Sequence, residues 1–65
     1  MTDAIARNIR TTIRKWKKEG TVGASIACLK QCVPTRGLMY SVSEYNEQFP
    51  IVAKQVANQL KFEIY

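Results

Sequence analysis

The chain has 65 residues, of which 46% are hydrophobic, and it carries a formal net charge of +5. This length suits one small domain, and this apolar content excludes an intrinsically disordered chain. A domain of this size buries only about 60% of the surface that its unfolded chain exposes, so association would stabilise it. We therefore expect a single domain spanning residues 1–65, and we expect it to form a homodimer.

The composition also limits the chemistry. The chain has no histidine, and the spacing of its five acidic residues does not demand a shared catalytic site. Glu44 and Glu47 share one helix face, but we expect both to be solvated. Gly20, Gly23 and Gly37 are scattered and do not form a phosphate-binding loop. We expect no enzyme activity and no cofactor.

The N-terminal segment lacks the apolar run of a secretory signal or a membrane span, which predicts a cytoplasmic protein without membrane association. Cys28 and Cys32 should then be reduced thiols. A structural zinc site needs more ligands than these two thiols supply, so we expect no metal. A disulfide within one helical turn has poor geometry. Both cysteines are therefore predicted to be small core or boundary residues.

Residues 2–20 predict a long amphipathic helix spanning about 3–19. Thr2 or Asp3 can cap its beginning, and Gly20 can adopt the left-handed conformation that ends a helix. Its apolar residues recur every three or four positions and fall within an arc of roughly 80°: Ile5, Ile9, Ile13 and Trp16. These side chains are predicted to face the core, with the tryptophan as an anchor rather than a stacking platform.

The opposite side of this helix is basic. Its cations fall within an arc of about 100°: Arg7, Arg10, Arg14, Lys17 and Lys18. Few acidic residues lie three or four positions away to pair with them, so the repulsion costs some stability unless an anionic partner relieves it. A basic face can also be no more than a solvated surface, and the sequence leaves both interpretations open.

Charge is unevenly distributed along the chain. Residues 1–36 hold eight basic and two acidic residues, a net +6, whereas residues 37–65 hold two basic and three acidic residues, a net −1. A basic half beside a nearly neutral half suggests one binding face and one packing half. Acidic partners such as nucleic acid or an acidic protein surface fit this distribution.

Residues 21–33 fit either a helix or a strand. The helix is favoured, because the apolar residues have helical spacing, Thr21 could cap the segment and Pro34 would end it. The alternative is a strand that includes Ile26 and Cys28, followed by a turn at residues 33–37.

Residues 38–42 alternate between apolar and polar positions as a short strand does. Ser41 and Glu44 have the spacing of a capping box, which predicts a helix beginning at Ser41 or Ser43. Pro50 should then break or kink that helix and begin a new one.

The new helix would have an apolar core face formed by Val52, Ala53, Val56, Ala57 and Leu60. The tail, residues 60–65, alternates again and predicts either a closing strand paired with residues 38–42 or the last turns of the helix. The predicted fold class is therefore α+β and mainly helical, with three to four helices and a small two-stranded β element. Helix-turn-helix and winged-helix domains have these parts.

The basic helix predicts a small nucleic-acid-binding regulatory protein that contacts phosphates. The predicted contacts are Arg7, Arg10, Arg14, Lys17 and Lys18, together with Arg36. Tyr40 is a candidate for stacking on a base. The alternative is a protein-interaction module, such as an inhibitor or adaptor, that docks on an acidic protein surface.

Overall fold

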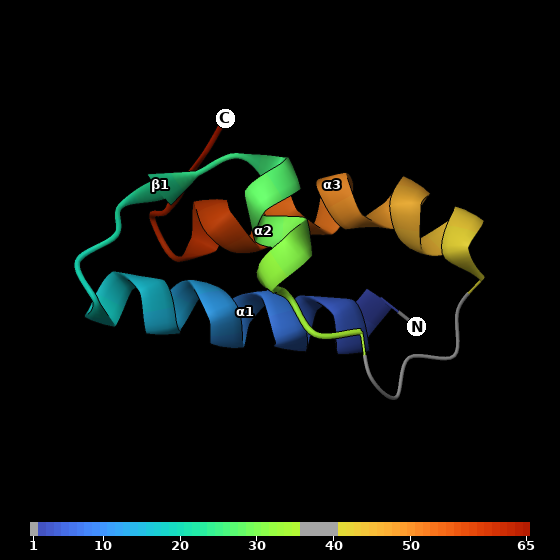
Figure 1. The fold of residues 1–65 in the computed structure, drawn as a ribbon, viewed down its shortest axis with the longest axis horizontal. Helices are drawn as coiled ribbons and strands as arrows, with labels where there is room; N and C mark the ends of the chain where they lie inside the picture. The colour runs from blue at the N-terminus through green and yellow to red at the C-terminus, as the bar shows by residue number, and fades with distance from the viewer. Residues whose placement is uncertain (1, 36–40) are drawn as a thin grey trace.

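Figure 1 shows the fold in the computed structural model, which describes residues 2–35 and 41–65. The elements in chain order are the helix α1 (Thr2–Lys18), the strand β1 (Gly23–Ala24), the helix α2 (Ile26–Cys32), the helix α3 (Val42–Gln59) and the strand β2 (Glu63–Ile64). The fold is thus mainly helical with a two-stranded sheet, which confirms the predicted fold class. The strand predicted near residues 38–41 falls largely outside the described residues.

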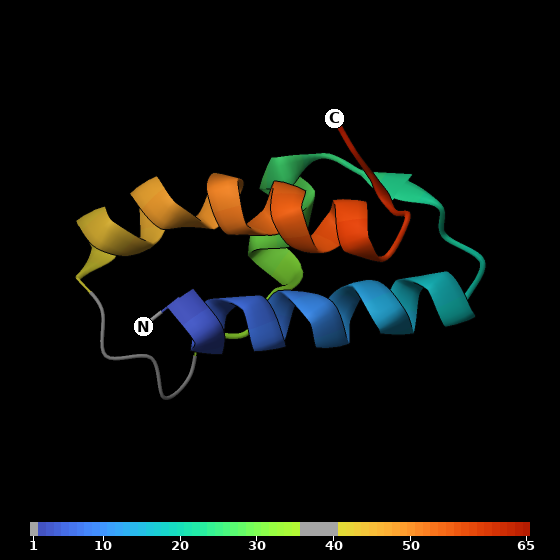
Figure 2. The same ribbon diagram turned by 180° about the vertical axis from the view of Figure 1, so that it is seen from behind.

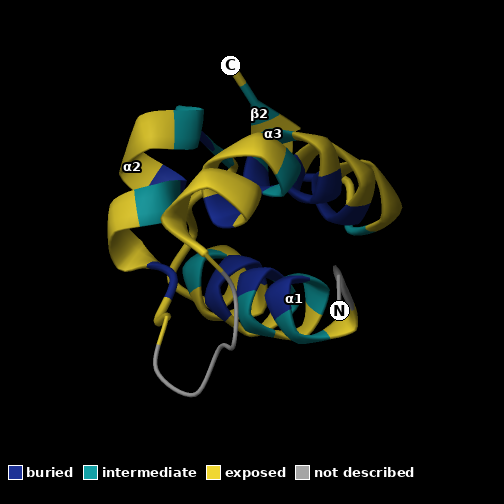
Figure 3. Cartoon of the chain, turned by 90° about the vertical axis from the view of Figure 1, so that its right-hand side faces the viewer, coloured by how far each residue is buried: buried dark blue, intermediate teal, exposed yellow. Residues whose placement is uncertain are grey.

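The helices α1 and α3 run side by side in the same direction, so both begin at one end of the molecule and finish at the other (Figures 1 and 2). The helix α2 covers one side of this pair, and the buried faces of all three helices meet in one core (Figure 3). The largest fully buried side chains are Ile5, Ile9, Ile13, Leu29 and Phe49. The three isoleucines of α1 therefore face inward, as their spacing predicted.

The C-terminal end of α1 forms a Schellman motif. The Thr21 N–H donates to the carbonyl of Trp16 at 2.8 Å, and the Gly20 N–H donates to that of Lys17 at 3.1 Å. Gly20 has a φ of +94°, the left-handed conformation that its position predicted. The chain leaves α1 through this turn and enters β1.

The C-terminal end of α3 forms the same motif with a different residue at its left-handed position. The Phe62 N–H donates to the carbonyl of Ala57 at 2.8 Å, and the Lys61 N–H donates to that of Asn58 at 3.3 Å. Here Lys61, not a glycine, has the left-handed backbone, with a φ of +56°. Because α1 and α3 are parallel, the two motifs deliver both strands to the same end of the molecule.

The two strands that follow α1 and α3 pair with each other in a sheet. The strands are parallel, with Gly23 opposite Glu63 and Ala24 opposite Ile64. A Cβ at Gly23 would lie 3.0 Å from the backbone oxygen of Glu63, so a side chain there would crowd β2 unless the strands moved apart by a few tenths of an ångström. The tail is therefore a strand, one of the two structures that its sequence allowed, and the parallel helices bring it to β1. Most of the partner expected for it, residues 38–42, lies outside the described residues.

The segment 21–33 forms the helix that its spacing favoured, and Ile26 and Cys28, which the alternative placed in a strand, lie in that helix. Its helix begins later than predicted, because residues 23–24 pair with β2 and Ser25, not Thr21, caps α2. The Ser25 hydroxyl accepts a hydrogen bond from the Cys28 N–H at 3.2 Å. Val33 then has an extended backbone, φ −78° and ψ 124°, as expected for a residue before a proline.

The helix α3 follows its predicted cap, Ser41, and continues through Pro50, where a break or kink was predicted. The Ser41 hydroxyl accepts a hydrogen bond from the Glu44 N–H at 3.1 Å. Pro50 lies inside α3, so the prediction of a new helix beginning there is wrong. A proline removes one helical hydrogen bond, but the buried side chains of Phe49 and Val52 hold the chain against the core on both sides of it.

Candidate functional site

The side of α1 opposite its isoleucines is a cationic surface. Arg7, Arg14 and Lys18 are exposed, and we call these three residues the α1 ridge. They lie along one side of a straight helix of 17 residues, within a narrow arc of its circumference. Arg10 lies closer to the core boundary and is half-buried. The structure thus exposes most of the cations that the sequence placed on this face.

The arginines of α1 are not neutralised by contacts within the described parts of the chain. The guanidinium groups of Arg7, Arg10 and Arg14 take part in none of the side-chain hydrogen bonds that join residues 2–35 and 41–65. A guanidinium presents several donors in a planar fork that matches the oxygens of a phosphate or a carboxylate. The donors of Arg7 and Arg14 therefore face solvent in a form suited to an anionic ligand.

Lys17 differs from the arginines, because it has a structural partner. Its ammonium group donates a hydrogen bond to the carbonyl of Leu60, the residue that caps the C-terminal end of α3. A cation at this end also interacts favourably with the helix dipole. Lys17 was predicted as a phosphate contact, and the structure shows that its ammonium group also ties α1 to α3. The sequence could not reveal this role, since the two residues are 43 positions apart.

Lys30 has a similar structural role on α2. Its ammonium group donates to the side-chain oxygen of Asn46 and lies 5.9 Å from the centre of the Tyr45 ring. Burial raises the pKa of the Tyr45 phenol, because desolvation penalises its ionised form. Two lysines thus join helices to one another, whereas the exposed arginines of α1 do not.

Two of the predicted contacts, Arg36 and Tyr40, lie outside the described residues. The helix-turn-helix arrangement also stays a prediction, because most of the segment between α2 and α3, residues 36–40, lies outside the described residues.

The tryptophan of α1 packs as predicted. Trp16 is half-buried against the core, and its ring centre lies 5.9 Å from that of Phe62 in a tilted arrangement. This contact joins α1 to Phe62, which follows the C-terminal end of α3. Trp16 thus packs between the C-terminal ends of the two helices.

The prediction for the cysteines is wrong. Cys28 and Cys32 are both free and exposed, and α2 fully buries only Leu29 between them. The reason is that α2 is a helix of only seven residues whose core contact runs through Leu29 and Val33. One turn of separation places the two cysteines on a stripe beside the buried one.

Comparisons with protein families, curated proteins and solved structures gave no match to this chain. Within residues 2–35 and 41–65, none of the helices has both the length and the apolar composition that crossing a membrane requires. The same residues contain no cluster of three or more side chains of the types His, Cys, Asp or Glu that could hold a metal ion.

Proposed function

We propose that this protein is a small regulatory protein that binds nucleic acid through its phosphates. The main contacts are Arg7 and Arg14, with Lys18 at one end of the α1 ridge and Arg10 at its border. The observation that carries the proposal is the exposure of arginine side chains that have no hydrogen-bond partner among the described residues. Arg36 and Tyr40 stay sequence-based predictions for an additional phosphate contact and a stacked base.

The dimensions of the ridge suit one nucleic-acid strand. Arg7 and Arg14 are two helical turns apart, which separates them by about 10 Å along the axis of α1. This distance corresponds to about three nucleotides of one strand of duplex DNA. The two guanidinium groups can therefore reach different phosphates of the same strand. Such contacts position a protein on the backbone without reading bases, so we expect weak sequence preference.

The salt dependence of binding tests this proposal. Affinity for a random DNA duplex should fall steeply as the salt concentration rises, because each cation–phosphate contact releases counterions. The variant Arg7→Gln plus Arg14→Gln removes two contacts, so the slope of log affinity against log salt should become shallower by about 1.8. Fluorescence anisotropy with a labelled duplex, repeated with single-stranded DNA and with RNA, measures this slope.

The matched control is Lys54→Gln plus Lys61→Gln, which removes the same charge from two exposed lysines of α3 and its end. This control should leave the slope nearly unchanged. Equal slopes for the two variants would show that net charge alone drives binding and would rule out the α1 ridge as the site. Absence of binding to DNA and RNA at low salt would reject the proposal as a whole.

The second candidate function is a protein-interaction module that docks on an acidic protein surface. It is favoured by apolar side chains at the sheet end of the molecule, where Val22 is 78% exposed and Tyr65 is 76% exposed. Acidic protein surfaces and phosphates both attract the α1 ridge, but a protein interface also has an apolar centre. Purification of partners from cell extract should then depend on Val22 and Tyr65 as well as on Arg7 and Arg14.

A further inference from the structure

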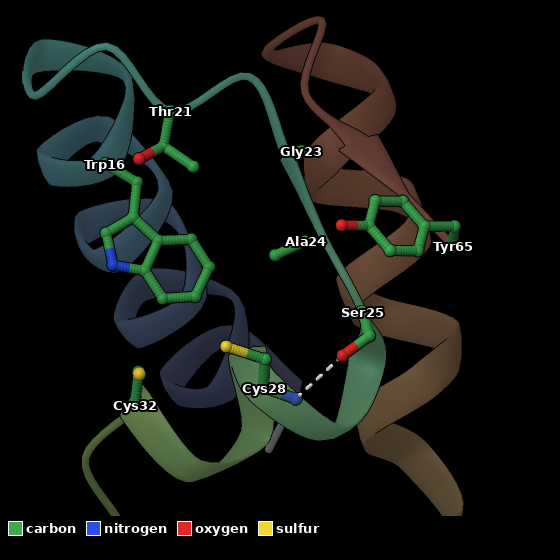
Figure 4. Close-up of a pocket in the computed structure, with 8 residues that line it drawn as sticks. All are labelled: Trp16, Thr21, Gly23, Ala24, Ser25, Cys28, Cys32 and Tyr65. Atoms are coloured by element: carbon green, nitrogen blue, oxygen red, sulfur yellow. Dashed lines mark hydrogen bonds between the residues drawn. The ribbon is translucent and has the colours of Figure 1, made fainter.

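An open hollow of about 530 Å³ lies beside β1 and brings together residues from both ends of the chain (Figure 4). Trp16 and Thr21 line it from the end of α1, and Tyr65 lines it from the tail. The exposed thiols of Cys28 and Cys32 line it from α2, and the figure shows both sulfur atoms on the side of α2 that faces the tryptophan. Two soft nucleophilic groups therefore share one hollow with two aromatic rings.

The available ligands limit what this hollow can hold. Two thiols are the only sulfur ligands besides methionine in the chain, and there is no histidine. The described residues provide no third carboxylate, thiol or imidazole beside them. Zinc completes its structural sites with more ligands than this, and calcium and magnesium require oxygen ligands. Thiolate ligands favour soft metal ions. Among the metal ions common in cells, Cu(I) is a soft ion that two thiolates can coordinate without further ligands.

We propose that Cys28 and Cys32 bind one Cu(I) ion per chain as a bis-thiolate. Both thiols lose their protons to solvent, two sulfur–copper bonds form, and no electron is transferred. The spacing of one helical turn places both sulfur atoms on the same side of α2. The indole of Trp16 borders the hollow and shields the ion from water on that side.

The chain contains one tryptophan, which makes the site observable. The full-length protein is reduced, kept free of oxygen and titrated with Cu(I) in competition with a chromophoric Cu(I) chelator, while the emission of Trp16 is recorded. We expect binding to saturate at one ion per chain and the emission to fall in parallel. Cys28→Ser and Cys32→Ser should each weaken binding by more than about 100-fold, since even loss of an outer-shell partner costs up to that amount.

The matched control is Ala27→Ser, which adds a hydroxyl at an exposed position of the same helix and should bind Cu(I) as the parent does. Circular dichroism verifies that each variant keeps its helices. Retention of parent affinity by either cysteine variant would overturn the proposal. So would saturation at one ion per two chains, which indicates a bridge between copies, or binding without a change in Trp16 emission, which places the ion elsewhere.

Discussion

The helices α1 and α3 pack in the same core but expose surfaces of different charge. They have 17 and 18 residues, run in the same direction and bury apolar faces in one core. The helix α3 carries one basic and two acidic residues, Lys54, Glu44 and Glu47, whereas α1 carries one acidic residue and six basic ones. The nearly neutral surface of α3 shows that packing against this core does not require a cationic helix. Packing against this core therefore does not account for the exposed arginines of α1.

The largest effects should come from the shared core. Ile9 and Phe49 are both fully buried, one on each long helix. Ile9→Ala should lower the free energy of unfolding by about 2–5 kcal/mol and Phe49→Ala by about 3–5 kcal/mol, because each leaves a cavity. Urea unfolding followed by circular dichroism measures both. Losses this large can unfold a domain of this size outright, which also satisfies the prediction.

The exposed side of α1 provides the contrast. Arg7→Gln should change the free energy of unfolding by no more than about 0.5 kcal/mol, because the side chain has no partner among the described residues. A destabilisation by Arg7→Gln as large as that by Ile9→Ala would mean that the arginine supports the fold. The comparison of α1 with α3 would then no longer point to an external ligand.

The sequence predicted what depends on neighbouring residues. The spacing of the isoleucines located the buried face of α1, and Ser41 marked the beginning of α3, because periodicity and capping involve residues within one or two turns. It did not predict that β2 pairs with β1 or that Lys17 bonds to Leu60, since both contacts join segments about 40 positions apart. The exposed arginines were predicted from the helix alone, whereas the hollow with its two thiols required the fold.

A second difference between the helices is the proline inside α3. Pro50 cannot donate the hydrogen bond that a residue at this position normally makes to the carbonyl of residue 46. Pro50→Ala restores that donor and should raise the free energy of unfolding by about 1–2 kcal/mol. The restored helical hydrogen bond stabilises the folded state, and the greater conformational freedom of the unfolded alanine chain offsets part of this stabilisation. Thermal unfolding measures the change. A lower melting temperature would show that the proline fits α3 without strain.

Substitutions at the left-handed positions of the two Schellman motifs should have effects of opposite sign. Gly20 has a φ of +94°, and a Cβ there would meet no atom within 4 Å, so Gly20→Ala costs only backbone strain, about 1 kcal/mol. Lys61 already bears such strain at a φ of +56°, so Lys61→Gly should stabilise by about 0.5–1 kcal/mol. Because the two sites form the same hydrogen bonds, urea unfolding of both variants compares the residue at the left-handed position directly. Destabilisation by Lys61→Gly would mean that the lysine side chain contributes to the end of α3, and the two helix ends would then differ in more than their backbone.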